Sequence, residues 1–131
     1  MNEQIKVVLV EPGKFARIEQ IEKGLESYQK IVGGWIEQVC PFDDPVAIVC
    51  NEEGKIDGLP LNRALVDEDD QIYDILAGTF FICGLGEEDY CSLTDELADK
   101  YLKLFQKPES FFRYPKSLSY TRIILEKEFE V

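Results

Sequence analysis

Four side chains of types that bind polar ligands lie in the first half of this 131-residue chain. Two amides beside one guanidinium would supply donors and acceptors for a phosphate or for the edge of a nucleobase. An exposed tryptophan next to a Gly-Gly pair would supply a ring on which a base stacks. These residues are our candidate ligand-binding set: Asn51, Asn62, Arg63 and Trp35.

A purely structural role is the alternative for each candidate. Asparagine side chains commonly shape turns by bonding to nearby backbone, and Arg63 would then pair with Asp57 or Asp67. Phe80 and Phe81 fit core packing better than base stacking, because large aromatic rings dominate protein interiors. Both interpretations stay open at the level of sequence.

Negative charge is concentrated in the middle of the chain. Residues 37–99 hold seventeen Asp and Glu against Lys55 and Arg63, whereas residues 100–131 carry a net charge of +3. Clustered Lys and Arg are needed to bind phosphates, so we expect no direct nucleic-acid binding by this acidic segment. An acidic segment suits a basic protein surface instead.

The carboxylates occur in clusters on expected loops. None has the spacing of an EF-hand, so no calcium site is predicted. They would either imitate the phosphates of DNA along one surface or form a solvated face that maintains solubility. The clusters are Asp43/Asp44, Glu52/Glu53, Asp67–Asp70 and Glu87–Asp89.

Cysteine and histidine usage narrows the possible chemistry. The chain has no histidine, which excludes His-based triads, His-ligated metals and imidazole acid/base catalysis. No C-x-x-C pair is present, so we expect free, mostly buried thiols, no metal, no cofactor and a location in the host cytosol. A hydrolase using Cys91 or a carboxylate is a weaker third hypothesis. The four cysteines are Cys40, Cys50, Cys83 and Cys91.

The pattern of apolar residues predicts one α+β domain over residues 1–131. Apolar runs between turn residues indicate strands, and apolar residues at helical spacing indicate two helices. Ser92 is the expected N-cap of the second helix, and Gly33-Gly34 is the expected end of the first. A mainly antiparallel sheet with both helices on one face is the simplest arrangement of this order. The expected strands are 4–10, 15–19, 35–40, 46–50, 80–83 and one within 120–129, and the expected helices are 21–32 and 92–107.

Several motifs resemble those of one known family. They are Ile5–Gly13, Val32–Glu37, Val49–Leu65 and Ala77–Gly84, and together they extend over about residues 4–106. The chain resembles the uncharacterised family called domain of unknown function 3846. The resemblance implies a small accessory protein of bacterial prophages and conjugative elements, often of low-GC Gram-positive hosts and sometimes near antirestriction genes. It implies no catalytic residues, and the aromatic segment 108–131 extends beyond it.

Two functions follow as hypotheses. The first is a non-enzymatic accessory protein of a phage or mobile element that acts against host defence by binding a nucleotide-type small molecule. The second is an acidic inhibitor that docks on a basic surface of a host defence protein. No apolar run approaches the roughly 20 residues of a membrane span, so no membrane partner is expected. A homo-oligomer through the C-terminal extension is a further expectation.

Overall fold

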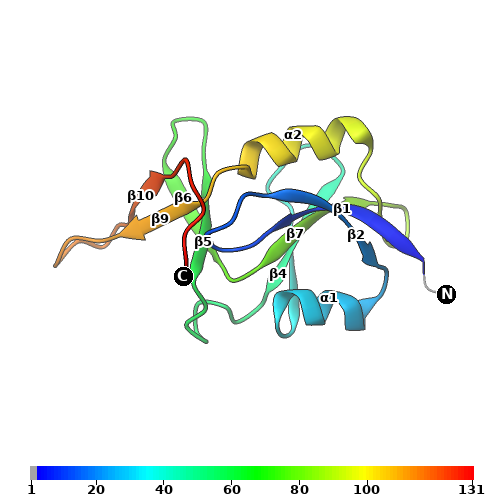
Figure 1. Ribbon diagram of the computed structural model, residues 1–131, viewed down its shortest axis with the longest axis horizontal. Coiled ribbons are helices and arrows are strands. Elements are labelled where there is room, and N and C mark those ends of the chain that lie inside the picture. The colour runs from blue at the N-terminus through cyan, green and yellow to red at the C-terminus, as the bar shows by residue number, and fades with distance from the viewer. Residues whose placement is uncertain (1–2) are drawn as a thin grey trace.

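The computed structural model describes residues 3–131 and contains a six-stranded antiparallel sheet (Figure 1). The strand order is β2-β1-β7-β4-β3, and β8 pairs with β7 off this path. The α+β class predicted from sequence is confirmed. The strands are β1 (Gln4–Val10), β2 (Arg17–Glu22), β3 (Ile36–Val39), β4 (Val46–Asn51), β7 (Phe80–Leu85) and β8 (Tyr90–Cys91).

Both faces of the sheet are covered, by one helix each. All six residues of β4 are buried, and so are the first five of β7, because their apolar side chains point alternately to the two faces. Helix α1 (Leu25–Val32) packs on one face and helix α2 (Asp95–Phe105) on the other (Figure 1). The expectation of both helices on one face is therefore wrong. A sheet that is apolar on both sides needs cover on both sides.

Two apolar clusters result, one on each face. On the α2 side, Tyr101 and Phe105 pack with Phe80 of the sheet. On the α1 side, Tyr28 packs with Phe81, the next residue along β7. Consecutive residues of one strand thus belong to opposite cores.

Capping residues fix the C-terminal end of α1 and the N-terminal end of α2. Helix α1 ends at Gly33, whose φ of 80° is left-handed, as the Gly-Gly pair predicts. The helix begins later than expected, because Ile21 lies on β2. Helix α2 is capped by Thr94, whose hydroxyl accepts from the Leu97 amide at 3.2 Å. Ser92, the expected cap, instead accepts from the amide of Lys6 at 2.9 Å.

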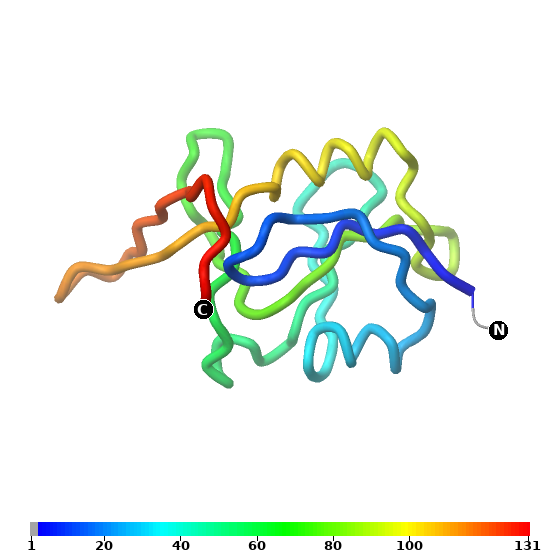
Figure 2. The backbone as a smooth tube through the Cα atoms, in the orientation of Figure 1, coloured from blue at the N-terminus to red at the C-terminus, as the bar shows by residue number. Residues whose placement is uncertain are grey.

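Two hairpins complete the fold outside the central sheet. Strands β5 (Leu61–Val66) and β6 (Ile72–Ala77) pair with each other, as do β9 (Glu109–Phe112) and β10 (Thr121–Ile124). Figure 2 shows the chain from 109 to 124 extending away from the body; we call this segment the arm. The strand expected within 120–129 is thus present, but it pairs with β9 rather than with the main sheet.

The last residues return to the body and pair with the turn after β1. The amide of Phe129 donates to the Gly13 carbonyl at 2.8 Å, and the Phe15 amide donates to Glu128 at 2.9 Å. Gly13 has a φ of 76°, and a Cβ there would overlap the Phe129 carbonyl oxygen. A glycine is therefore required where the C-terminal segment lies against this turn.

Substitution of Gly13 tests this contact. Gly13→Ala combines backbone strain with displacement of the Phe129 carbonyl, so we expect a loss of unfolding free energy clearly above the roughly 1 kcal/mol of strain alone. Gly58→Ala is the matched control, because Gly58 has a φ of 73° and nothing within 4 Å of its added Cβ. Urea denaturation of both variants measures the difference. Equal losses would contradict the close contact.

Candidate functional site

Arg63, the central residue of the candidate set, is fully buried on β5. Its Nε donates to the Phe105 carbonyl at 3.1 Å, and Nη2 donates to the Lys14 carbonyl at 2.6 Å. Nη1 donates to the side-chain oxygen of Asn62 at 2.9 Å. The guanidinium therefore joins the end of α2, the turn after β1 and β5, and its fixed fork of donors suits three acceptors in different directions.

The charge of Arg63 is compensated mainly by carbonyl dipoles. Neither Asp57 nor Asp67 pairs with it, in contrast to the structural alternative drawn from sequence. Burial lowers the pKa of Arg63 to about 10, and the charge of nearby Glu109 opposes that shift. The guanidinium stays protonated at neutral pH and keeps all its donors.

Asn62 belongs to the same network. Its side-chain amide donates to the carbonyls of Val10 at 2.9 Å and Gly78 at 2.8 Å, while its oxygen accepts from Arg63. The side chain is buried and every polar atom of it is used. Asn62 and Arg63 are thus brought together as expected, but they bond to the protein's own backbone.

Asn51 and Trp35 lie elsewhere, at the junction of α1, β3 and β4. Asn51 donates to the Val32 carbonyl at 3.1 Å and accepts from the Glu53 amide at 2.8 Å. Trp35 is 69% exposed, as expected for a stacking residue. The structure does not bring Arg63 and both asparagines into one site, because each asparagine completes a separate set of backbone hydrogen bonds.

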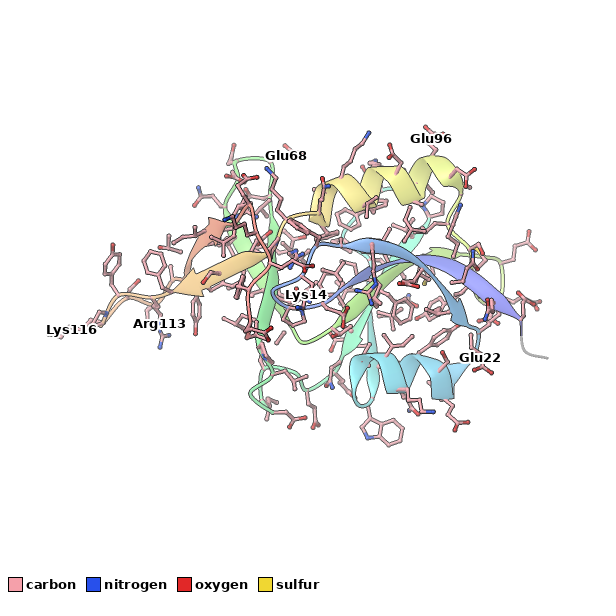
Figure 3. All side chains as sticks on the ribbon, in the orientation of Figure 1. Lys14, Glu22, Glu68, Glu96, Arg113 and Lys116 are labelled. Carbon is pink, nitrogen blue, oxygen red and sulfur yellow. The ribbon has the colours of Figure 1, made fainter. Side chains whose placement is uncertain are left out.

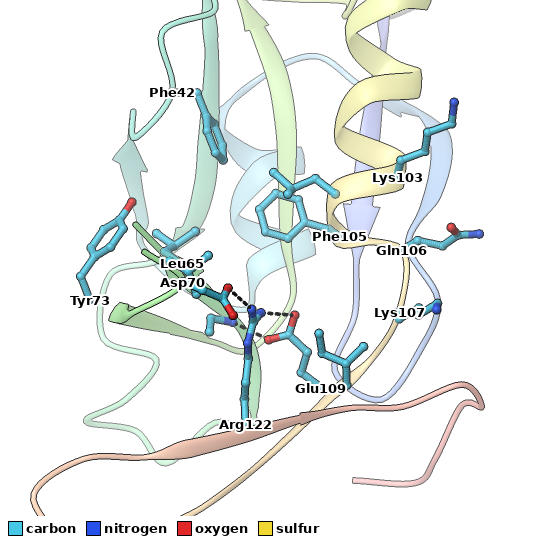
Figure 4. A pocket seen from close by; sticks show the side chains of 14 residues that line it. Phe42, Leu65, Asp70, Tyr73, Lys103, Phe105, Gln106, Lys107, Glu109 and Arg122 are labelled. Carbon is cyan, nitrogen blue, oxygen red and sulfur yellow. Dashed lines mark hydrogen bonds and ion pairs between the residues drawn. The ribbon is translucent and has the colours of Figure 1, made fainter. Parts of the chain in front are cut away.

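A hollow of about 470 Å³ opens beside this network, between the end of α2, the β5–β6 hairpin and the base of the arm (Figure 4). We call it the Arg122 hollow. Its volume falls within the range of small-molecule sites. Its lining includes Phe42, Leu65, Asp70, Tyr73, Lys103, Phe105, Lys107, Glu109, Arg122 and Ile124.

Arg122 and Glu109 form the charged centre of the hollow, where the arm meets β5. Glu109 is buried; one carboxylate oxygen accepts from the Ala64 amide at 2.9 Å and the other from Arg122 at 3.3 Å. The Arg122 guanidinium, whose side chain is 19% exposed, also meets Asp70 at 3.0 Å. Asp70 is 79% exposed, so one edge of the guanidinium is covered only by a solvated carboxylate (Figure 4).

Phe42 is positioned over the hollow by a constrained loop. Asp44, two residues on, accepts from Lys100 and from the Tyr101 hydroxyl, both at 2.6 Å. The hydrogen bond from Lys100 contributes most, and that from Tyr101 next, to lowering the pKa of the Asp44 carboxyl. The Phe42 ring packs 4.8 Å from the Tyr101 ring, centroid to centroid. The Phe42 side chain is thus held in place by packing against α2.

Sequence reasoning missed Arg122 and Glu109. They stand thirteen positions apart in a segment recognised only as aromatic, and hairpin pairing of β9 with β10 brings them together. The sequence did contain a signal for this pair. Glu109 is the one acidic residue at the start of the segment, and Arg122 precedes the apolar run Ile123–Leu125, so a partly buried arginine there would need an acidic partner.

The buried thiols are poor nucleophiles. Burial raises the pKa of Cys50 and of Cys83 to about 12, so both stay protonated at neutral pH. Among residues 3–131, no group of three or more Cys, Asp or Glu side chains is arranged to hold a metal ion. Within the same residues, no helix has the length and apolar character needed to cross a membrane.

The fold and the hollow define an α+β domain with a cationic, partly aromatic depression beside its second helix. The chain belongs to the family described as Domain of unknown function (DUF3846), whose model matches residues 5–106. No curated protein and no solved structure matches it. Arg63 lies in the matched part, whereas Glu109, Arg122 and the rest of the arm lie outside it.

Replacement of Arg63 tests its structural role. Arg63→Met leaves carbonyl oxygens of Phe105 and Lys14 and the Asn62 amide oxygen without donors, so we expect a loss of about 3 kcal/mol or more of unfolding free energy. Lys55→Met removes the other cation of the acidic segment, but Lys55 is exposed and should change stability by under about 1 kcal/mol. Urea denaturation compares the two. Similar values would contradict the role assigned to Arg63.

Proposed function

We propose that the protein is a non-enzymatic accessory protein of a phage or mobile element and binds a nucleotide-type small molecule in the Arg122 hollow. The role drawn from sequence is kept, while the residues that carry it change from the buried Arg63 network to the adjacent hollow. The mobile-element setting rests on membership of the DUF3846 family and on the resemblance described above.

The state of Arg122 is the observation that carries this proposal. Buried Glu109 holds the guanidinium from one side, which orients its planar fork without removing it from solvent. Exposed Asp70 occupies the other edge and stands where an anionic group of a ligand would bind. A phosphodiester offers the same bidentate geometry and the same charge as a carboxylate. The rest of a nucleotide would add contacts within the hollow, so its phosphate competes well for this position.

Aromatic and basic side chains complete the proposed site. Phe42 and Tyr73 line the hollow and offer ring faces to a base, in the role that the sequence assigned to Trp35. Lys103 and Lys107 stand on its rim, where each is paired with an exposed carboxylate, Asp99 and Glu126 respectively. Such exposed pairs are weak, so both lysines are available to an anion.

A binding role is favoured over catalysis by the chemistry of these side chains. The chain has no histidine, and its two buried thiols are protonated at neutral pH. An arginine, two lysines and aromatic rings recognise and hold a nucleotide, and none of these groups is a ready general base at neutral pH. The two carboxylates of the hollow, Asp70 and Glu109, are both paired with Arg122. Sequestering a nucleotide signal needs only affinity, and this would serve a mobile element against host defence. The four free cysteines suit the host cytosol as the place of action.

Titration calorimetry with cyclic dinucleotides, cyclic trinucleotides and ADP-ribose derivatives tests the proposal. We expect heat from at least one class of ligand. Arg122→Lys keeps a charge beside Glu109 but loses the planar fork, so it should weaken that binding about tenfold. Absence of heat from the whole panel would overturn the proposal.

Asp70→Asn gives a sharper test, because it should tighten binding. Removing the competing carboxylate frees one edge of Arg122, and an exposed ion pair of up to about 1 kcal/mol corresponds to a gain of up to about fivefold in affinity. Asparagine tolerates the φ of 61° at this position as aspartate does. Asp69→Asn, one residue earlier in the turn, is the control and should leave affinity unchanged. Weaker binding by Asp70→Asn would place the ligand elsewhere.

The acidic surface supports a second candidate function, docking on a basic host protein. Glu68, at the tip of the β5–β6 hairpin, and Glu96, on α2, lie along the same edge of the molecule (Figure 3). Neither forms an ion pair with any residue of the described part of the chain. Unpaired carboxylates spaced along one edge suit a cationic partner.

Salt dependence and charge removal test this second function together. A host protein captured by the wild type at about 0.1 M salt should be released at about 1 M, where charges are screened beyond about 3 Å. Capture should also fall when Glu68→Gln and Glu96→Gln are combined. Glu22→Gln with Glu26→Gln, on the α1 side, is the matched control. Capture that survives both high salt and the first pair of substitutions would contradict docking through this edge.

A further inference from the structure

The tip of the arm carries exposed apolar and basic side chains. Leu118 is 95% exposed and Tyr114 67%. Arg113 and Lys116 lie at the far end of the arm, away from the body of the molecule (Figure 3). The Arg113 guanidinium lies over the Tyr120 ring, 5.3 Å from its centroid. Such a surface is characteristic of an interaction site.

The arm is also an incomplete sheet. Within residues 3–131, β10 pairs only with β9, and Ile123 and Ile124 are half exposed along it. A two-stranded ribbon is marginally stable in water unless a further strand or surface covers it. The base of the arm is held to β5 through Glu109, so a partner that covered the outer part of the ribbon would stabilise it further.

The charge of the arm indicates the kind of partner. From Ser110 to Leu125 the sequence contains three cations, Arg113, Lys116 and Arg122, and no acidic residue. The rest of the chain is strongly acidic. Like charges prevent two arms from packing together, whereas an arm and an acidic body attract each other.

A groove that complements the arm tip lies beside the turn after β4. The groove has a volume of about 260 Å³, and its rim includes Glu37, Glu52 and Glu53, which form no ion pairs within the described residues. Ile56, also on the rim, is one of the most exposed apolar side chains of the body. We call this the Glu52 groove; it offers carboxylates to Arg113 and Lys116 and an apolar contact to Leu118.

We propose that the protein forms a two-fold symmetric dimer in which the arm tip of each copy docks in the Glu52 groove of the other. A reciprocal exchange of this kind closes on itself, so it gives a dimer and not a filament. It covers the exposed tip, brings Arg113 and Lys116 to unpaired carboxylates, and leaves the Arg122 hollow at the base of the arm. The dimer does not depend on the ligand function.

Charge reversal tests the dimer. By analytical ultracentrifugation at low salt, the wild type should be a dimer. A variant with Arg113→Glu and Lys116→Glu should be a monomer, and so should a variant with Glu52→Lys and Glu53→Lys. An equimolar mixture of the two variants should form a heterodimer, because each reversed arm then meets a reversed groove and each native arm a native groove. Lys30→Glu, on α1 and outside both surfaces, is the control and should remain a dimer.

Three outcomes would overturn the proposal. The first is a wild type that stays monomeric over the concentration range of the experiment. The second is a dimer that both reversed variants retain, since that interface would lie elsewhere. The third is a monomer that binds single-stranded DNA in a fluorescence-anisotropy assay and loses this binding when Arg113→Glu and Lys116→Glu are combined. That result would make the basic, aromatic tip of the arm a nucleic-acid-binding surface. Far-ultraviolet circular dichroism confirms that each variant is folded.

Discussion

The buried guanidinium of Arg63 is the interaction on which the arrangement of the other elements depends. It holds the Phe105 carbonyl at the end of α2 and the Lys14 carbonyl in the turn after β1. A charge buried without a carboxylate partner is costly unless its donors are satisfied, and here backbone carbonyls and Asn62 provide the acceptors. The end of α2, the β1–β2 turn and β5 are therefore mutually constrained. The hollow and the arm are built on that constrained region.

The second buried charge, Glu109, continues the same region into the arm. Its carboxylate accepts the Ala64 amide of β5 and the Arg122 guanidinium of β10. One side chain thus fastens the arm to the hairpin and orients the cation proposed to bind a ligand. Glu109 and Arg122 lie outside the part matched by the family model, whereas other residues that line the hollow, such as Phe42 and Tyr73, lie within it.

The distribution of charge gives the two ends of the arm different surroundings. At its base, Arg122 is compensated by Glu109 and Asp70, so this cation is oriented and partly shielded. At its tip, Arg113 and Lys116 face away from the body, which is acidic and would attract them in a second molecule (Figure 3). A negative body also keeps its copies apart except where the basic arms meet it. The ligand site proposed at the base and the association proposed at the tip are therefore compatible in one molecule.

Local chemistry allowed the sequence alone to determine the class of fold and the elements of the core, but not the strands β5, β6, β8 and β9. The apolar run Val46–Cys50 predicted a buried strand, and Gly33 predicted the end of α1, because strand burial and a left-handed helix stop depend on adjacent residues. Only the tertiary structure decided which face each helix covers and where the donors of Arg63 point. The acceptors of that guanidinium on α2 and in the β1–β2 turn lie 42 and 49 positions away in the sequence. A pattern of neighbouring residues cannot predict a contact between positions so far apart. For the same reason the partnership of Glu109 with Arg122 followed from hairpin pairing and not from either residue alone.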